Sequence, residues 1–164
     1  MQNVYSQPDE AVSSLDPAVE AQLRSGANWF YWIAGLSLVN SAIFAFGGQI
    51  SFIAGLGLTQ VIDAIFTVAV EEGAPSQIIA VAVVIDVMVA AVFALFGYYA
   101  NKGFGWVFIL GIALYLLDAL VYLAVGSVLA AAFHAFVLYR LVIGFMASRQ
   151  LKQFAAENLS VGAA

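Results

Sequence analysis

Four side chains that can bind a proton or a metal ion stand inside otherwise apolar stretches of this sequence. They are Asp63, Asp86, Asp118 and His134. An ionised side chain at the centre of a bilayer costs about 2.5–3.5 kcal/mol or more unless something compensates its charge. Residues of this kind inside membrane segments pair with one another, relay protons or bind ions. The chemistry that these residue types predict is therefore proton or cation binding.

The composition indicates an integral membrane protein. The chain has 164 residues, of which 64% are hydrophobic and 9% charged, with a mean hydropathy of +1.00, whereas a soluble domain has about 25% charged residues. There is no cysteine, so thiolate metal sites and cysteine nucleophiles are excluded. His134 is the only histidine, which excludes a multi-histidine zinc site. A net charge of −5 without a basic patch argues against a nucleic-acid partner.

Five segments are long and apolar enough to be predicted as membrane spans, which need about 20 residues each. The predicted fold is an all-α, polytopic bundle of five transmembrane helices within residues 28–147. The second segment contains Gly55, Gly57 and Gln60, a pattern that also fits a broken or re-entrant helix. We take it as spanning because of its length and the polar connection that follows. The predicted spans are residues 29–47, 50–70, 77–99, 106–125 and 128–147.

Polar segments flank the predicted bundle. Residues 1–27 form an acidic N-terminal tail, in which Asp16-Pro17 is typical of a helix start. Leu15, Val19 and Leu23 make an apolar stripe there, which predicts a short amphipathic helix on the membrane surface that ends at Gly26. Residues 148–164 are predicted as a polar C-terminal tail.

Five spans put the two termini on opposite sides of the membrane. Lys102, Arg149 and Lys152 then share the side of the C-terminus, and Arg24 stands alone on the other. The excess of basic residues on the cytoplasmic side of membrane proteins predicts a cytoplasmic C-terminus and an outside N-terminus. The sequences LLDAL (116–120) and FHAFVLYRLVIGF (133–145) are similar to those of small multi-pass bacterial proteins, which implies the bacterial inner membrane. No signal-peptide pattern precedes the first span.

The four ionisable residues are predicted to lie at one depth. A helical rise of ~1.5 Å per residue places them ~9 to 13 Å from the outer ends of their four segments. Polar side chains on the same helix faces are predicted to support them, with Thr59, Gln60 and Thr67 surrounding Asp63. The supporting residues are Asn40, Thr59, Gln60, Thr67, Tyr115, Tyr122 and Arg140.

Charge counting leaves this layer with an excess negative charge. Three carboxylates face two candidate cations, Arg140 and a protonated His134, and we expect Asp86 to pair with Arg140. One aspartate must then be protonated, or a bound cation must complete the layer. A structural interpretation stays open, in which Asp118 is only a hydrogen-bonded link between helices and His134 a packing donor.

The sequence therefore favours a small membrane protein that binds or transports protons or cations, with an oligomer or a partner membrane protein completing a conduit. One alternative is an accessory subunit whose buried polar groups only fix helix packing. The second is an intramembrane hydrolase with a divalent metal held by Asp63, Asp86, Asp118 and His134. No catalytic motif for hydrolysis or phosphate binding is present, so an enzyme is the less favoured interpretation. No cofactor is predicted apart from that candidate divalent cation.

Overall fold

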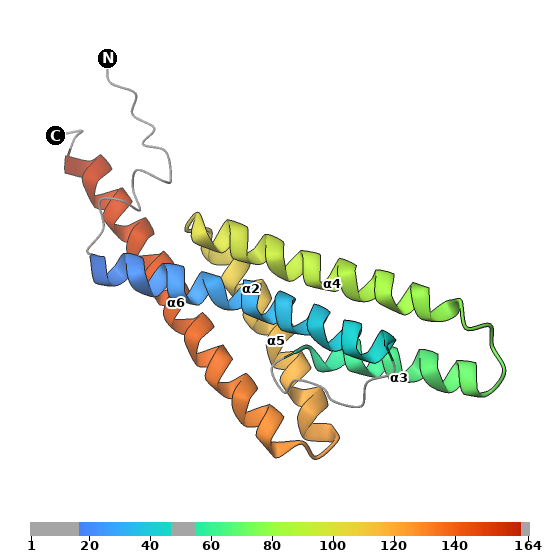
Figure 1. Ribbon diagram of the computed structural model, residues 1–164. Coiled ribbons are helices and arrows are strands. Elements are labelled where there is room, and N and C mark those ends of the chain that lie inside the picture. The colour runs from blue at the N-terminus through green and yellow to red at the C-terminus, as the bar shows by residue number, and fades with distance from the viewer. Residues whose placement is uncertain (1–16, 47–54, 162–164) are drawn as a thin grey trace.

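The protein is an all-α bundle. The computed structural model describes residues 17–46 and 55–161, which form five helices (Figure 1). Residues 1–16 of the predicted N-terminal tail, residues 47–54, which include the start of the second predicted span, and residues 162–164 lie outside the described part of the chain. The helices are α2 (Pro17–Ala45), α3 (Gly57–Glu71), α4 (Ile78–Asn101), α5 (Gly105–Ala124) and α6 (Val128–Val161).

The connections that follow α3, α4 and α5 each contain a glycine with a positive φ angle. Gly73, Gly103 and Gly126 have φ values of 104°, 81° and 74°, and each is the second residue after a helix end. A left-handed residue at this position closes the last helical turn, and glycine adopts it without steric cost. The α3–α4, α4–α5 and α5–α6 turns are therefore encoded locally.

Helix α2 is continuous, which corrects the expected short surface helix. It runs for 29 residues through Gly26, where we expected an end. A Cβ atom on Gly26 would lie 2.6 Å from the Cα atom of Gly144 in α6. Gly26 is therefore a close-packing residue between two crossing helices, and a packed helix interior tolerates it.

The core lies where α2 contacts α4, α5 and α6. Phe30 of α2 is completely buried, and its ring contacts those of Phe93, Phe96 and Phe108. Three of the helices, α4, α5 and α6, are long and apolar enough to cross a membrane. Helix α6 also continues through most of the predicted polar tail, because its sequence there lacks helix breakers and Leu151 packs in the core.

Helix α3 covers only part of the second predicted span. Its 15 residues measure about 22 Å, less than the ~30 Å of a bilayer's hydrocarbon core. Gly55 and Leu56 precede it in non-helical conformation. The described part of this segment, from residue 55 on, is therefore not helical throughout, and five membrane-spanning helices are not confirmed.

The described helices start and finish at one end of the bundle, whereas five spans would place the start of α2 and the end of α6 at opposite ends. The start of α2 lies beside the end of α4, where Asn101 donates a hydrogen bond to Asn28, and Leu151 of α6 packs at Gly103. Pro17 and the end of α6 are consequently at the same end of the bundle (Figure 1). The physical reason is the short α3. It begins inside the bundle beside Asp118 and runs to the α3–α4 turn, at the same end of the bundle as the end of α2 (Figure 1).

Candidate functional site

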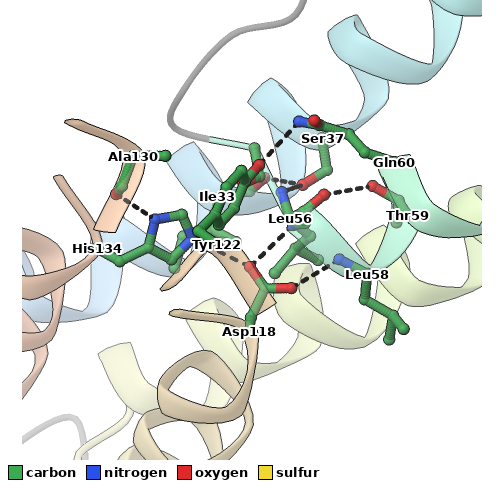
Figure 2. A network of polar contacts seen from close by, with 12 residues as sticks. Ile33, Ser37, Leu56, Leu58, Thr59, Gln60, Asp118, Tyr122, Ala130 and His134 are labelled. Atoms are coloured by element: carbon green, nitrogen blue, oxygen red, sulfur yellow. Dashed lines mark hydrogen bonds and ion pairs between the residues drawn. The ribbon is translucent and has the colours of Figure 1, made fainter. Parts of the chain in front are cut away.

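Asp118 of α5 caps the start of α3. Its Oδ2 atom accepts a hydrogen bond from the backbone N–H of Gly57 at 2.9 Å, and Oδ1 accepts one from Leu58 at 2.8 Å (Figure 2). Leu56, at the capping position itself, supplies no side-chain bond. A helix start exposes unpaired N–H groups and a partial positive charge, and both stabilise a carboxylate. Helix α3 therefore compensates the charge that made Asp118 costly in an apolar helix.

The non-helical backbone before α3 is hydrogen-bonded by side chains from three helices. Ser37 of α2 accepts a hydrogen bond from the N–H of Leu56 at 2.9 Å, and Thr59 donates one to the Leu56 carbonyl at 2.8 Å. The hydroxyl of Tyr122 donates to the carbonyl of Gly55 at 3.2 Å. Irregular backbone at membrane depth is tolerated only where such groups are paired inside the protein. The start of α3 meets this condition.

His134 of α6 completes the Asp118 site. Its Nδ1 atom lies 2.8 Å from the carbonyl of Ala130, and its Nε2 atom lies 3.0 Å from Oδ2 of Asp118. A carbonyl can only accept, so Nδ1 carries a hydrogen. One further proton must then lie between Nε2 and Oδ2, whether the pair is imidazolium and carboxylate or neutral imidazole and carboxylic acid. The pair is electrically neutral in both forms.

Two tyrosines of α5 enclose the imidazole ring. The ring of Tyr115 stacks on it at a centroid distance of 4.5 Å and an interplanar angle of 14°, and Tyr122 lies against it at 4.7 Å. Aromatic faces attract a cation, and the two backbone N–H donors at Asp118 stabilise a carboxylate. The surroundings of the pair can therefore stabilise opposite charges on its two members.

Asp63 and Asp86 form a second pair, between α3 and α4. Their carboxyl groups lie near enough to repel each other, and the two residues are 3% and 0% exposed. Neither oxygen of Asp86 has a hydrogen-bond partner among the described residues. Two neighbouring carboxylates in a low-dielectric interior are costly when both are ionised, so a shared proton would stabilise the pair.

The four predicted residues are all buried, but they form two pairs instead of one cluster. Asp63 lies six residues after Gly57, about 9 Å along α3 from the Asp118 contact. Among the described residues, no three of the histidine and acidic side chains come together as ligands for a metal ion. The four-ligand metal site proposed for a hydrolase is therefore not assembled.

The structure corrects several supporting roles. Arg140 donates to Ser25 of α2 and so does not pair with Asp86. Gln60 donates to the hydroxyl of Tyr122 at 2.8 Å and, like Thr59, serves the start of α3 instead of Asp63. Thr67 is half-buried one turn beyond Asp63.

Two further predicted supporting residues are buried beside the pairs. Asn40 packs closely against Gly55, on the α2 side of the segment before α3. Tyr115 stacks on His134, and its hydroxyl has no hydrogen-bond partner among the described residues.

Sequence reasoning missed the most important partners of Asp118, which are backbone N–H groups. Gly55 and Gly57, which indicated a break in the second segment, were the available signal for them. Ser25, the partner of Arg140, carried no signal that distinguishes it from other helix serines.

Comparison with known proteins gives one partial match. Residues 114–157 match a family model described as a vacuolar membrane protein. The matched region covers most of α5 and α6 and includes Asp118 and His134, but it is less than half of the chain. No curated protein and no solved structure matches the chain. Together with the three apolar helices, the match supports assignment as a membrane protein.

Proposed function

We propose that this membrane protein reversibly binds a proton at the Asp63–Asp86 pair and exchanges it across the bilayer. The observation that supports this most is that two buried carboxyl groups lie near each other while neither oxygen of Asp86 has a hydrogen-bond partner among the described residues. A structural carboxylate would be saturated with donors, as Asp118 is. Asp63 and Asp86 instead have the arrangement of a carboxyl dyad that shares a proton.

A proton suits this pair better than a metal ion. A divalent cation takes four or more ligands, and the pair offers two carboxyl groups without a third acidic or histidine ligand in the described structure. A proton needs only the two facing oxygen atoms. A proton shared by Asp63 and Asp86 then neutralises one of their two carboxyl groups. This accounts for the excess negative charge that was counted among the buried residues of the sequence.

Proton flux into liposomes tests this function. With purified protein in vesicles and a pH-sensitive dye inside, the wild type should dissipate a pH gradient faster than protein-free vesicles. Asp63→Asn and Asp86→Asn should reduce the excess rate at least tenfold, because an amide cannot exchange the proton. Glu72→Gln is the matched control, since Glu72 is an exposed acid in the α3–α4 turn. Equal rates in wild type and Asp63→Asn would refute the proposal.

An accessory, structural role is the second candidate, and the Asp118–His134 pair favours it. All of the hydrogen bonds of the Asp118 carboxyl oxygens are made with the start of α3 or with His134. The pair therefore fixes how α3 sits between α5 and α6. We assign this structural role to the Asp118–His134 pair and proton exchange to the Asp63–Asp86 pair.

We further propose that α2, α4, α5 and α6 cross the membrane and that α3 belongs to a re-entrant segment. Helix α2 has the length to cross, about 43 Å, and packs along α4 through Phe30. Arg24 then joins the other terminal basic residues at one end, while Glu71 and Glu72 lie at the opposite end. The positive-inside rule makes the first end cytoplasmic, so both termini are cytoplasmic. The basic residues at that end are Arg24, Lys102, Arg149 and Lys152.

Single cysteines distinguish this topology from five spans, because the chain has no cysteine of its own. We expect Arg24→Cys and Lys152→Cys to react with a membrane-impermeant thiol reagent from the same side, and Glu72→Cys from the other side. Five spans would put Arg24→Cys with Glu72→Cys instead. Reaction of Arg24→Cys and Lys152→Cys from opposite sides would therefore contradict the re-entrant topology.

The bacterial inner membrane stays our prediction for location, and the partial family match names a vacuolar membrane. We also propose that copies of this chain, or a partner membrane protein, assemble around the bundle to complete the path between the Asp63–Asp86 pair and water.

A further inference from the structure

A groove lies between α4 and α5, beside the start of α3. It encloses about 450 Å³, within the usual range of ligand pockets, about 300–1,000 Å³. Its floor is formed by buried residues, among them Leu56 and Phe93, and its rim by half-exposed ones, among them Leu58, Val92 and Leu117. Helices α4 and α5 pack together less than α5 and α6 do, and they separate away from their linking turn (Figure 1).

The lining of this groove is apolar except for one side chain. Asp118 is the exception, and its carboxyl oxygens already accept hydrogen bonds from Gly57, Leu58 and His134. A water molecule needs two to four polar partners to be stable in a cavity, and this lining does not provide them. An occupant must therefore be apolar where it contacts the protein.

We propose that the groove binds a single lipid acyl chain. Its rim is continuous with the exposed apolar faces of α4 and α5, two helices suited to cross a membrane, so hydrocarbon chains already cover the rim. The turn of Lys102, Gly103 and Phe104 joins α4 to α5 and limits how far they can part for a partner helix. A flexible hydrocarbon chain fits an apolar slot of this volume. The proposal does not depend on proton binding at Asp63.

The acyl chain would also shield the cap of α3. Asp118 lies at the inner wall of the groove, so a chain bound there excludes water from the bonds to Gly57 and Leu58. Hydrogen bonds to a carboxylate are stronger in such a dry site. Lipid in the groove would thus support the re-entrant position of α3.

Photo-crosslinking tests the site. Purified protein is placed in phosphatidylcholine vesicles with a fraction of lipid that carries a diazirine in the middle of one acyl chain, and the labelled residues are mapped by mass spectrometry. We expect label on the floor residues Leu56 and Phe93, which are only 2% and 4% exposed. Label confined to rim residues such as Leu117 would overturn the proposal, because ordinary bilayer contact explains it.

A matched pair of variants adds a second criterion. Val92→Phe fills the groove and should lower floor labelling at least fivefold, whereas Val84→Phe, on the exposed surface of α4 outside the groove, should leave it unchanged. Equal floor labelling in Val92→Phe and wild type would contradict the site. Efficient disulfide dimers of Leu117→Cys would likewise overturn it, since a second copy would then cover the groove.

Discussion

Replacing Asp118 by alanine should lower the free energy of unfolding by about 3–5 kcal/mol, the range for breaking a buried ion pair. The variant leaves the N–H groups of Gly57 and Leu58 without acceptors and His134 without its partner. All of these groups are in the interior, so water cannot replace the lost bonds. Chemical denaturation in detergent micelles, followed by circular dichroism, measures the loss.

Two comparisons separate this cap from a general effect of losing an acid. Glu72→Ala removes an exposed carboxylate and should change stability by less than about 0.5 kcal/mol. Asp118→Asn should cost less than Asp118→Ala, because the amide oxygen can still accept from Leu58 and the amide N–H can donate to a neutral His134. A loss below about 1 kcal/mol in Asp118→Ala would mean that α3 is held by other contacts.

Stability should fall as pH rises from about 4 towards neutral values. In this range the folded protein holds a proton on the Asp63–Asp86 pair, whereas an aspartate in the unfolded chain ionises at about pH 3.9. The folded state thus binds one proton more, and unfolding becomes easier as this proton is withdrawn. The effect is up to about 1.4 kcal/mol per pH unit.

One variant assigns this pH dependence to the pair. Asp63→Asn should reduce the slope of stability against pH by the share of one proton, because the amide can donate to an ionised Asp86. Glu72→Gln should leave the slope unchanged. A wild-type stability that is constant, or that increases, between about pH 4 and neutral pH would contradict a protonated pair in the folded state.

The membrane helices were predictable because apolar length is a strong signal. Segments 77–99, 106–125 and 128–147 correspond to the three helices that can cross a membrane. The second segment was harder to predict, because its length favoured a span while Gly55 and Gly57 favoured a break. Whether it spans decides whether Arg24 is predicted on the same side of the membrane as the C-terminal basic residues or on the other side.

The burial of the four candidate residues could be predicted from the sequence, but not which of them form pairs. Asp63, Asp86, Asp118 and His134 drew attention because each is an ionisable residue in an apolar segment. Which of them meet depends on which helices are neighbours, and a single sequence does not contain that information. The main partner of Asp118 is the backbone at the start of α3, for which the only signal in the sequence was the break indicated by Gly55 and Gly57.

Infrared spectroscopy of the purified protein at neutral pH tests the protonated dyad most directly. We predict an absorption band of a protonated carboxylic acid in wild type that shifts on exchange into heavy water. The band should disappear in the double variant Asp63→Asn/Asp86→Asn and persist in Glu72→Gln. A wild-type spectrum that shows only ionised carboxylates would contradict the central claim that Asp63 and Asp86 share a proton.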